Sequence, residues 1–171
     1  MKKVLALAIS ISSFANAQHT YIIGDSLSSP TGCEWAKQLP GAIHNYAQAG
    51  LTLEAFDFPN HLKIERGGKA VVYIGTNDAG SGVPVKKFKR KLEETVSSLQ
   101  IRGAEVYLIA QPQVNVKLLN EFRQTTEEVA IKYSATYLDP GWGIESTVDG
   151  IHPSCLNHVY LGQWMNYMLG Y

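Results

Sequence analysis

The sequence predicts an α/β protein built on a parallel β-sheet, and two observations support this prediction. Short apolar runs alternate along the chain with longer segments whose apolar residues recur every three or four positions. Several of the apolar runs stop at a glycine or at another turn-forming residue. Strands that alternate with helices pair in parallel and leave helices on both faces of the sheet. We therefore expect one parallel sheet between two helical layers.

Five apolar runs are the candidate strands. They cover residues 19–23, 42–47, 70–74, 105–110 and 136–138. The first stops at Gly24, the third at Gly75, and the fifth at a turn that begins with Asp139 and Pro140. In a parallel sheet, ligands bind beyond the carboxyl ends of the strands. Polar residues that follow these runs are therefore expected to gather at one edge of the sheet.

The helical segments are expected over residues 31–39, 85–101, about 118–133 and about 156–169. The second and third carry apolar residues at the spacing of one buried helical face. In the last helix, Leu161, Met165 and Met168 are expected to lie on a common face. The basic run from Lys86 to Lys91 could contact anionic lipid or polysaccharide, but the solvated face of an amphipathic helix, with Phe88 inward, is the favoured interpretation.

The first 17 residues have the pattern of a secretory signal peptide. Lys2 and Lys3 precede an apolar stretch, and residues 15–17 read Ala-Asn-Ala, a typical cleavage site. Removal of this segment would leave one domain over residues 18–171, exported to the periplasm or the medium. That domain would hold 13 basic and 15 acidic residues, a balance that does not favour nucleic-acid binding. No apolar run is long enough for stable membrane insertion, and we expect a monomer.

The tripeptide Gly24-Asp25-Ser26 follows the first strand and supplies a candidate nucleophile, Ser26. Taken alone, these three residues are equally typical of an ordinary turn. Two further groups at the same edge could stabilise a negatively charged oxygen: the backbone N–H of Gly50 after the second strand, and the side-chain amide of Asn77 after the third. Each of them also has a plain interpretation as a turn residue.

The segment Asp149-Gly150-Ile151-His152-Pro153 supplies the candidate acid and base. A serine hydroxyl needs a base to take its proton, and a histidine base needs a carboxylate to fix its tautomer. Asp149 and His152 are three residues apart, so one short loop can deliver both. A metal site would need further ligands, and no second cluster with suitable spacing is present in the sequence. No metal or cofactor is expected.

The chain has two cysteines, Cys33 and Cys155. Export would permit a disulfide between them. Cys33 follows Ser26 by seven residues and Cys155 follows His152 by three, so the two thiols would be neighbours if Ser26 and His152 meet. Two separate buried thiols remain the alternative, because the sequence does not show whether their geometry suits a bond.

These blocks, in this order, resemble the SGNH (GDSL) hydrolase family. Gly24-Asp25-Ser26-Leu27 resembles the first block of that family, Gly50 the second, Gly75-Thr76-Asn77 the third, and Asp149 with His152 the last. The resemblance implies a flavodoxin-like three-layer α/β/α sandwich with a five-stranded parallel sheet. It also implies a Ser26–His152–Asp149 triad and an oxyanion hole made by Ser26, Gly50 and Asn77.

The likeness is greatest to the small periplasmic thioesterase/lysophospholipase type. Two blocks depart from that type: Leu51 and Thr52 follow Gly50 without its usual Gly-Asp-Thr, and Thr76 replaces a common glycine. The acyl and alcohol preferences are therefore not carried over. The preferred function is an exported serine esterase for lipid, thioester or small acyl esters. The alternatives are an O-acetyl esterase for envelope or extracellular polysaccharide, and a non-catalytic module that binds carbohydrate or lipid.

Overall fold

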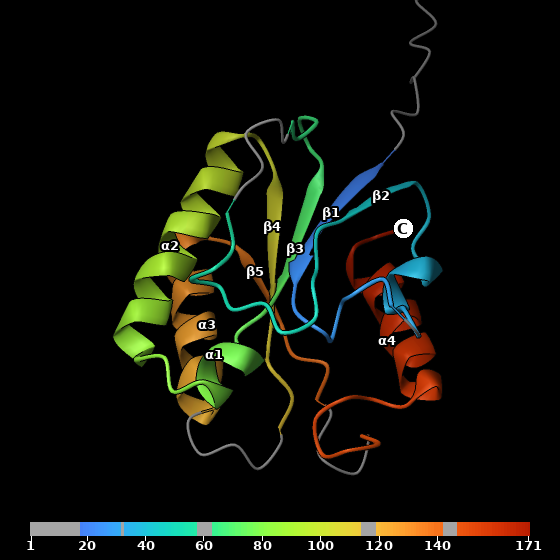
Figure 1. Cartoon of the computed structure of the whole chain (residues 1–171). Coiled ribbons are helices and arrows are strands. Elements are labelled where there is room, and N and C mark those ends of the chain that lie inside the picture. Colours follow the sequence, from blue (N-terminus) through green and yellow to red (C-terminus); the bar gives the residue numbers. More distant parts are fainter. Residues whose placement is uncertain (1–17, 32, 58–62, 114–118, 142–146) are drawn as a thin grey trace, which may run out of the picture.

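The computed structural model describes residues 18–31, 33–57, 63–113, 119–141 and 147–171. The signal peptide expected over residues 1–17 lies outside the described residues. The described chain contains a sheet of five strands, all parallel: β1 (His19–Gly24), β2 (Ala42–Asn45), β3 (Lys69–Tyr73), β4 (Glu105–Ile109) and β5 (Thr136–Leu138). Their order in space is β2-β1-β3-β4-β5 (Figure 1). This is the flavodoxin-like order, and the predicted fold class is confirmed.

Helices cover both faces of this sheet (Figure 1). One layer holds α1 (Thr76–Gly80), α2 (Val85–Ile101) and α3 (Leu119–Tyr133). The opposite layer holds α4 (Cys155–Met168) and the short 3₁₀ helix η1 (Trp35–Gln38). The sequence analysis located α2 at the same bounds and α3 and α4 within one residue.

The central strands are apolar on both sides because two hydrophobic cores cover them. Along β3, Ala70 and Val72 belong to the core under α2 and α3, whereas Val71 and Tyr73 belong to the core under α4. All four side chains are at most 2% exposed. Alternation between the two cores follows from the two-residue period of a strand. This burial explains why the strand reads as an uninterrupted apolar run.

One expectation about the helices was wrong. The helix expected over residues 31–39 is only the four-residue η1, whose N-cap, Glu34, makes no side-chain capping hydrogen bond. This turn packs closely on α4, because a Cβ atom at Gly162 would lie 2.3 Å from the carbonyl oxygen of Trp35. In α4, Leu161 and Met165 are buried, and Met168 is 37% exposed. The buried positions in α4 are 158, 161, 162 and 165, and Met168 lies beside that face.

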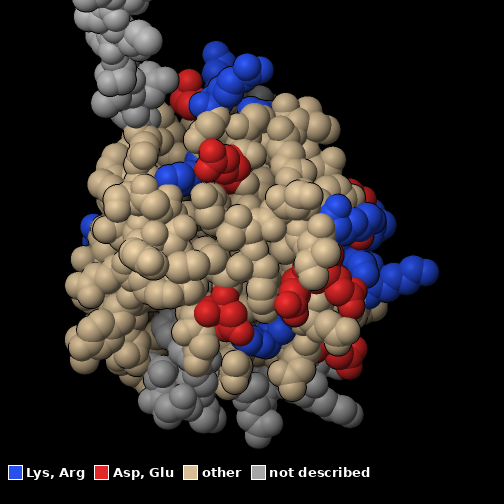
Figure 2. All heavy atoms as spheres, turned by 180° about the vertical axis from the view of Figure 1, so that it is seen from behind, with Lys and Arg blue, Asp and Glu red and all other residues tan. Residues whose placement is uncertain are grey.

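Charge is distributed unevenly over the surface. Phe88 is buried as expected, and neighbouring basic side chains of α2 form ion pairs, including Lys89 with Glu128 and Arg90 with Glu94. In the view from behind, charged side chains gather toward the side of α2, and the side of α4 carries few of them (Figure 2). These ion pairs favour the solvated-face interpretation of the basic run. Among the described residues, no helix is both long enough and apolar enough to cross a membrane.

Candidate active site

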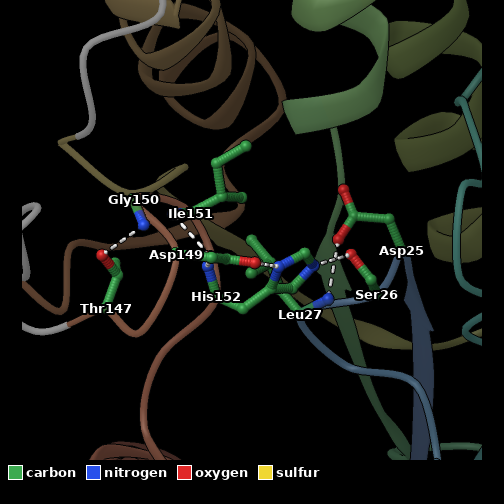
Figure 3. Close-up of polar contacts among 8 residues, drawn as sticks. All are labelled: Asp25, Ser26, Leu27, Thr147, Asp149, Gly150, Ile151 and His152. Atoms are coloured by element: carbon green, nitrogen blue, oxygen red, sulfur yellow. Dashed lines mark hydrogen bonds and ion pairs between the residues drawn. The ribbon is translucent and has the colours of Figure 1, made fainter.

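The site lies where β1 and β3 end, at the carboxyl edge of the sheet. In the sheet, β1 has β2 on one side and β3 on the other, so the strand order reverses at β1, and ligands of such sheets bind beyond the strand ends at this switch point. Ser26 follows β1, Gly50 follows β2, and Asn77 lies in α1, directly after β3. The loop that precedes α4 brings Asp149 and His152 to the same place (Figure 3).

Ser26, His152 and Asp149 form a continuous chain of hydrogen bonds (Figure 3). The Ser26 Oγ atom is 2.8 Å from His152 Nε2, and His152 Nδ1 is 2.7 Å from Asp149 Oδ2. With the carboxylate ionised, Nδ1 carries the proton that it donates to Asp149. Nε2 is then free to accept the proton of the Ser26 hydroxyl. The three residues that the sequence analysis selected are thus brought together in the order nucleophile, base and acid.

A compact turn fixes Asp149 and His152 relative to each other. Asp149 Oδ1 accepts hydrogen bonds from the backbone N–H groups of His152 at 2.7 Å and Ile151 at 3.0 Å. Thr147 closes the turn through its hydroxyl, which accepts from the Gly150 N–H at 3.0 Å. The hydrogen bonds from the His152 backbone and ring, with that from Ile151, lower the pKa of Asp149 to about 2. The carboxylate therefore stays ionised at neutral pH and keeps the imidazole in one orientation.

The turn after β1 presents Ser26 and buries its neighbours. Ser28 and Ser29 are 1% and 6% exposed, and the Ser28 hydroxyl accepts a hydrogen bond from the Trp35 indole at 3.2 Å. Gly24 is needed here for close packing, because a Cβ atom would lie 2.7 Å from the Tyr73 carbonyl oxygen. Of the three serines in this segment, Ser26 is the one whose hydroxyl contacts His152.

The loops that carry the other two oxyanion candidates lie side by side. Asn77 Nδ2 donates a hydrogen bond to the carbonyl oxygen of Leu51 at 3.1 Å, next to Gly50. This bond uses one amide hydrogen and leaves the second for a ligand. Gly50 is exposed with a φ of 78°, and a Cβ atom built there would meet nothing within 4 Å. Its main chain is thus open to a substrate.

The sequence analysis missed two carboxyl groups of the site, Asp25 and Asp78. Both side chains are fully buried. Burial raises the pKa of Asp25 to about 7, against the opposing effect of a hydrogen bond from the Leu27 N–H. Burial likewise raises the pKa of Asp78, although the Leu53 N–H opposes this. The available signal was an acid placed directly after an apolar strand or next to Asn77, but turn propensity explained both positions.

A disulfide bond joins Cys33 to Cys155. Their Cα atoms are 5.1 Å apart, and 122 positions separate them in the sequence. The bond ties the segment after Ser26 to the first residue of α4, which follows His152 closely. It therefore links the two parts of the chain that carry nucleophile and base. No group of three side chains suited to hold a metal ion occurs in the described part of the chain.

No family model and no curated protein matches the chain by sequence. Solved structures do match it. A protein assigned to the lipolytic G-D-S-L family of Desulfitobacterium hafniense DCB-2 superposes with a TM-score of 0.76 at 19% identity, over 88% of this chain and 98% of the other. A lipase/acylhydrolase from Enterococcus faecalis gives 0.73 at 19% identity, over 89% and 95%. The fold is that of the SGNH hydrolases.

The SGNH fold is shared with enzymes of different named specificity. A carbohydrate acetylesterase from Sinorhizobium meliloti superposes on this chain with a TM-score of 0.72 at 15% identity, over 89% of this chain and 98% of its own. At such identities the likeness establishes the architecture. The chemistry of this chain must be argued from its own residues.

Proposed function

We propose that this chain is a serine esterase that hydrolyses acyl esters through Ser26, His152 and Asp149. The observation that carries this proposal is the hydrogen-bonded chain from the Ser26 hydroxyl through His152 to the Asp149 carboxylate. Ser26 and His152 are 126 positions apart in the sequence. Their contact aligns a nucleophile, a base and an acid as acyl transfer requires.

The reaction would proceed in two halves. His152 Nε2 takes the proton of Ser26 as Oγ attacks the ester carbonyl carbon. The resulting oxyanion would be held by the backbone N–H groups of Ser26 and Gly50 and by the Asn77 amide. His152 then gives its proton to the departing alcohol or thiol, which leaves the acyl group on Ser26. Water attacks this ester with His152 again as the base, and the acid is released. These steps need no metal or cofactor.

Lipid, thioester or small acyl esters are the preferred substrates. Two exposed apolar side chains lie on either side of Asp149 and His152 in the sequence. Val148 is 72% exposed and Leu156 is 60% exposed. Such side chains suit an acyl chain better than a sugar. The motif resemblance to the periplasmic thioesterase/lysophospholipase type supports the same choice.

An O-acetyl esterase for polysaccharide is the second candidate. The exposed main chain at Gly50 supports it, since no atom of the described residues beyond the chain neighbours of Gly50 lies within 4 Å of the position of a Cβ atom there. The fold shared with a carbohydrate acetylesterase adds to that support. A binding module without catalysis is the third candidate, and it has no need of the hydrogen-bonded chain described above.

Hydrolysis of p-nitrophenyl esters of increasing chain length separates the three candidates. Turnover that extends to long acyl chains supports the lipase-like esterase, and turnover of the acetate alone supports the deacetylase. Ser26→Ala is the matched control, and it should abolish turnover while its circular dichroism stays that of the wild type. A fluorophosphonate should label Ser26. No turnover of any ester, or a label on Ser28 or Ser29, would contradict the proposed mechanism.

Export to the periplasm or the medium is part of the same proposal. The Cys33–Cys155 disulfide supports it, because such bonds persist in oxidising compartments. The N-terminal 17 residues support it through their signal-peptide pattern. Mass spectrometry of protein recovered outside the cytoplasm should find a chain that begins at Gln18. Recovery of the full-length chain in the cytoplasm alone would contradict it.

A further inference from the structure

Two buried acids that the proposed reaction does not use lie beside the oxyanion candidates. Asp25 precedes Ser26 and Asp78 follows Asn77, and neither carboxyl group is exposed to solvent. Figure 3 shows the carboxyl group of Asp25 bonded to the backbone nitrogen of Leu27, whereas the Ser26 hydroxyl is bonded to His152. Both acids are therefore shielded from solvent, and neither makes the hydrogen bonds that join Ser26, His152 and Asp149.

Asp25 connects the nucleophile turn to the start of α1. Its Oδ1 atom accepts a hydrogen bond from the backbone N–H of Leu27 at 3.0 Å. The other oxygen, Oδ2, is buried without a hydrogen-bond partner among the described residues, and the nearby Thr76 N–H opposes the rise in the pKa of this carboxyl group. Leu27 lies one residue after Ser26, and Thr76 lies one residue before Asn77. One side chain thus links the segments that carry two of the three oxyanion candidates.

Asp78 connects α1 to the loop after β2. Both of its carboxylate oxygens accept from the Leu53 N–H, at 3.1 Å and 2.9 Å. The neighbouring Asn77 amide donates to the Leu51 carbonyl of the same loop at 3.1 Å. The Gly50 loop is thus held to α1 at two points, and one of them is a carboxylate that does not reach the surface.

We propose that Asp25 and Asp78 are positioning residues that keep the three oxyanion donors in fixed positions relative to one another. The inference rests on the proposed function, and it goes further by assigning a task to two acids outside the triad. Oxyanion stabilisation depends on donors already fixed where charge develops. The donors here come from three separate strand ends. Side chains that cross-link those ends can supply that fixity without contacting the substrate.

The energetics of the acids support this role. Burial raises the pKa of both carboxyl groups, and the charge of Asp78 raises that of Asp25 further. Two acids buried close together oppose folding when they ionise. A pair whose only task was to fill space would be better replaced by apolar side chains.

Asp78→Asn is the first test variant. Asparagine offers one acceptor oxygen where the carboxylate offers two, so the hold on Leu53 is weakened with little change in volume. We expect kcat toward a p-nitrophenyl ester to fall by about ten- to a hundredfold, with KM within about twofold. Asp139→Asn is the matched control, because it removes a carboxylate that pairs with Arg123 beyond β5. Its kcat should equal that of the wild type.

A double-mutant comparison separates positioning from general damage. If Asp78 acts through Asn77, then Asp78→Asn should reduce kcat much less in an Asn77→Ala background than in the wild type. Losses that multiply in the double variant would overturn the inference. A wild-type kcat in Asp78→Asn would also overturn it. Asp25→Ala, which removes the acceptor of the Leu27 N–H, is the second variant if the first does not fold, and the same lowered kcat is expected.

Hydrogen exchange gives a readout that does not depend on turnover. In the wild type, the Leu53 amide should be protected, and Asp78→Asn should speed its exchange while Asp139→Asn leaves it unchanged. Unchanged exchange in Asp78→Asn would overturn the inference even in an active enzyme. A wild type that hydrolyses no ester but shows the expected exchange would contradict the proposed function and leave the tether itself established.

Discussion

Replacement of Asp25 by asparagine should make the protein less sensitive to rising pH. Asparagine has nearly the shape of a protonated aspartic acid, and it can still accept the hydrogen bond from the Leu27 N–H. The substitution thus removes the ionisation and keeps the shape. Its effect isolates the energetic consequence of a buried acid whose pKa is raised from 3.8 to about 7.

The sign follows from proton binding. Between about pH 4 and pH 7, the folded protein holds a proton on Asp25 that the unfolded chain has released. Folding is then coupled to proton uptake, so the free energy of unfolding falls as the pH rises through this range. A shift of roughly 3 pKa units corresponds to about 4 kcal/mol between the two ends of the range. Above the folded-state pKa, the loss is complete.

Urea unfolding of the oxidised protein at pH 4 to pH 8 measures this effect. The difference in unfolding free energy between Asp25→Asn and the wild type should move by about 4 kcal/mol in favour of the variant across that range. Asp139→Asn serves as the control, and its difference from the wild type should stay nearly constant. A constant difference for Asp25→Asn as well would refute the argument that Asp25 is buried and protonated at low pH.

Three further predictions concern the site. Asn77→Ala should lower kcat by about a hundredfold or more with little change in KM, measured by steady-state kinetics, because this donor acts mainly in the transition state; an unchanged kcat would reduce Asn77 to a turn residue. Asp149→Asn should lower kcat by roughly 10³- to 10⁴-fold, and because hydrogen bonds lower the pKa of Asp149 to about 2, this carboxylate should stay ionised across the acidic part of the wild-type pH profile. Reduction of the Cys33–Cys155 bond should lower activity at temperatures below that of unfolding, and it should lower the free energy of unfolding by up to about 5 kcal/mol. Intact-mass measurement with and without reductant and alkylation tests for the bond, and two thiols alkylated without reductant would contradict it.

The secondary structure was largely predictable because it depends on local patterns. Residues 70–74 are apolar throughout, and such a run indicates a strand covered on both faces. The spacing of Phe88, Leu92, Val96 and Leu99 places them on one side of a helix, and all four are buried in α2. The prediction of a helix over residues 31–39 was wrong because η1 packs closely on Gly162 of α4, and no local sequence pattern shows such a contact.

In the candidate site too, some features could be predicted from local sequence and others could not. The chemistry of Ser26, Asp149 and His152 could be read from residue type and spacing, because a nucleophile, a base and an acid are recognisable as such. The short turn that holds Asp149 beside His152 is also local. The tertiary structure distinguishes Ser26 from Ser28 and Ser29, because the hydroxyl of Ser26 contacts His152 whereas the other two serines are buried.

The sequence by itself determined the alternation of strands and helices and the inventory of reactive groups. The tertiary structure decided the contact of Ser26 with His152, the pairing of Cys33 with Cys155, and the burial of Asp25. Local preferences act over a few residues, whereas these contacts join segments more than a hundred positions apart or depend on solvent exclusion by other elements. An acid in a turn therefore looks the same in the sequence whether water or a hydrophobic core surrounds it.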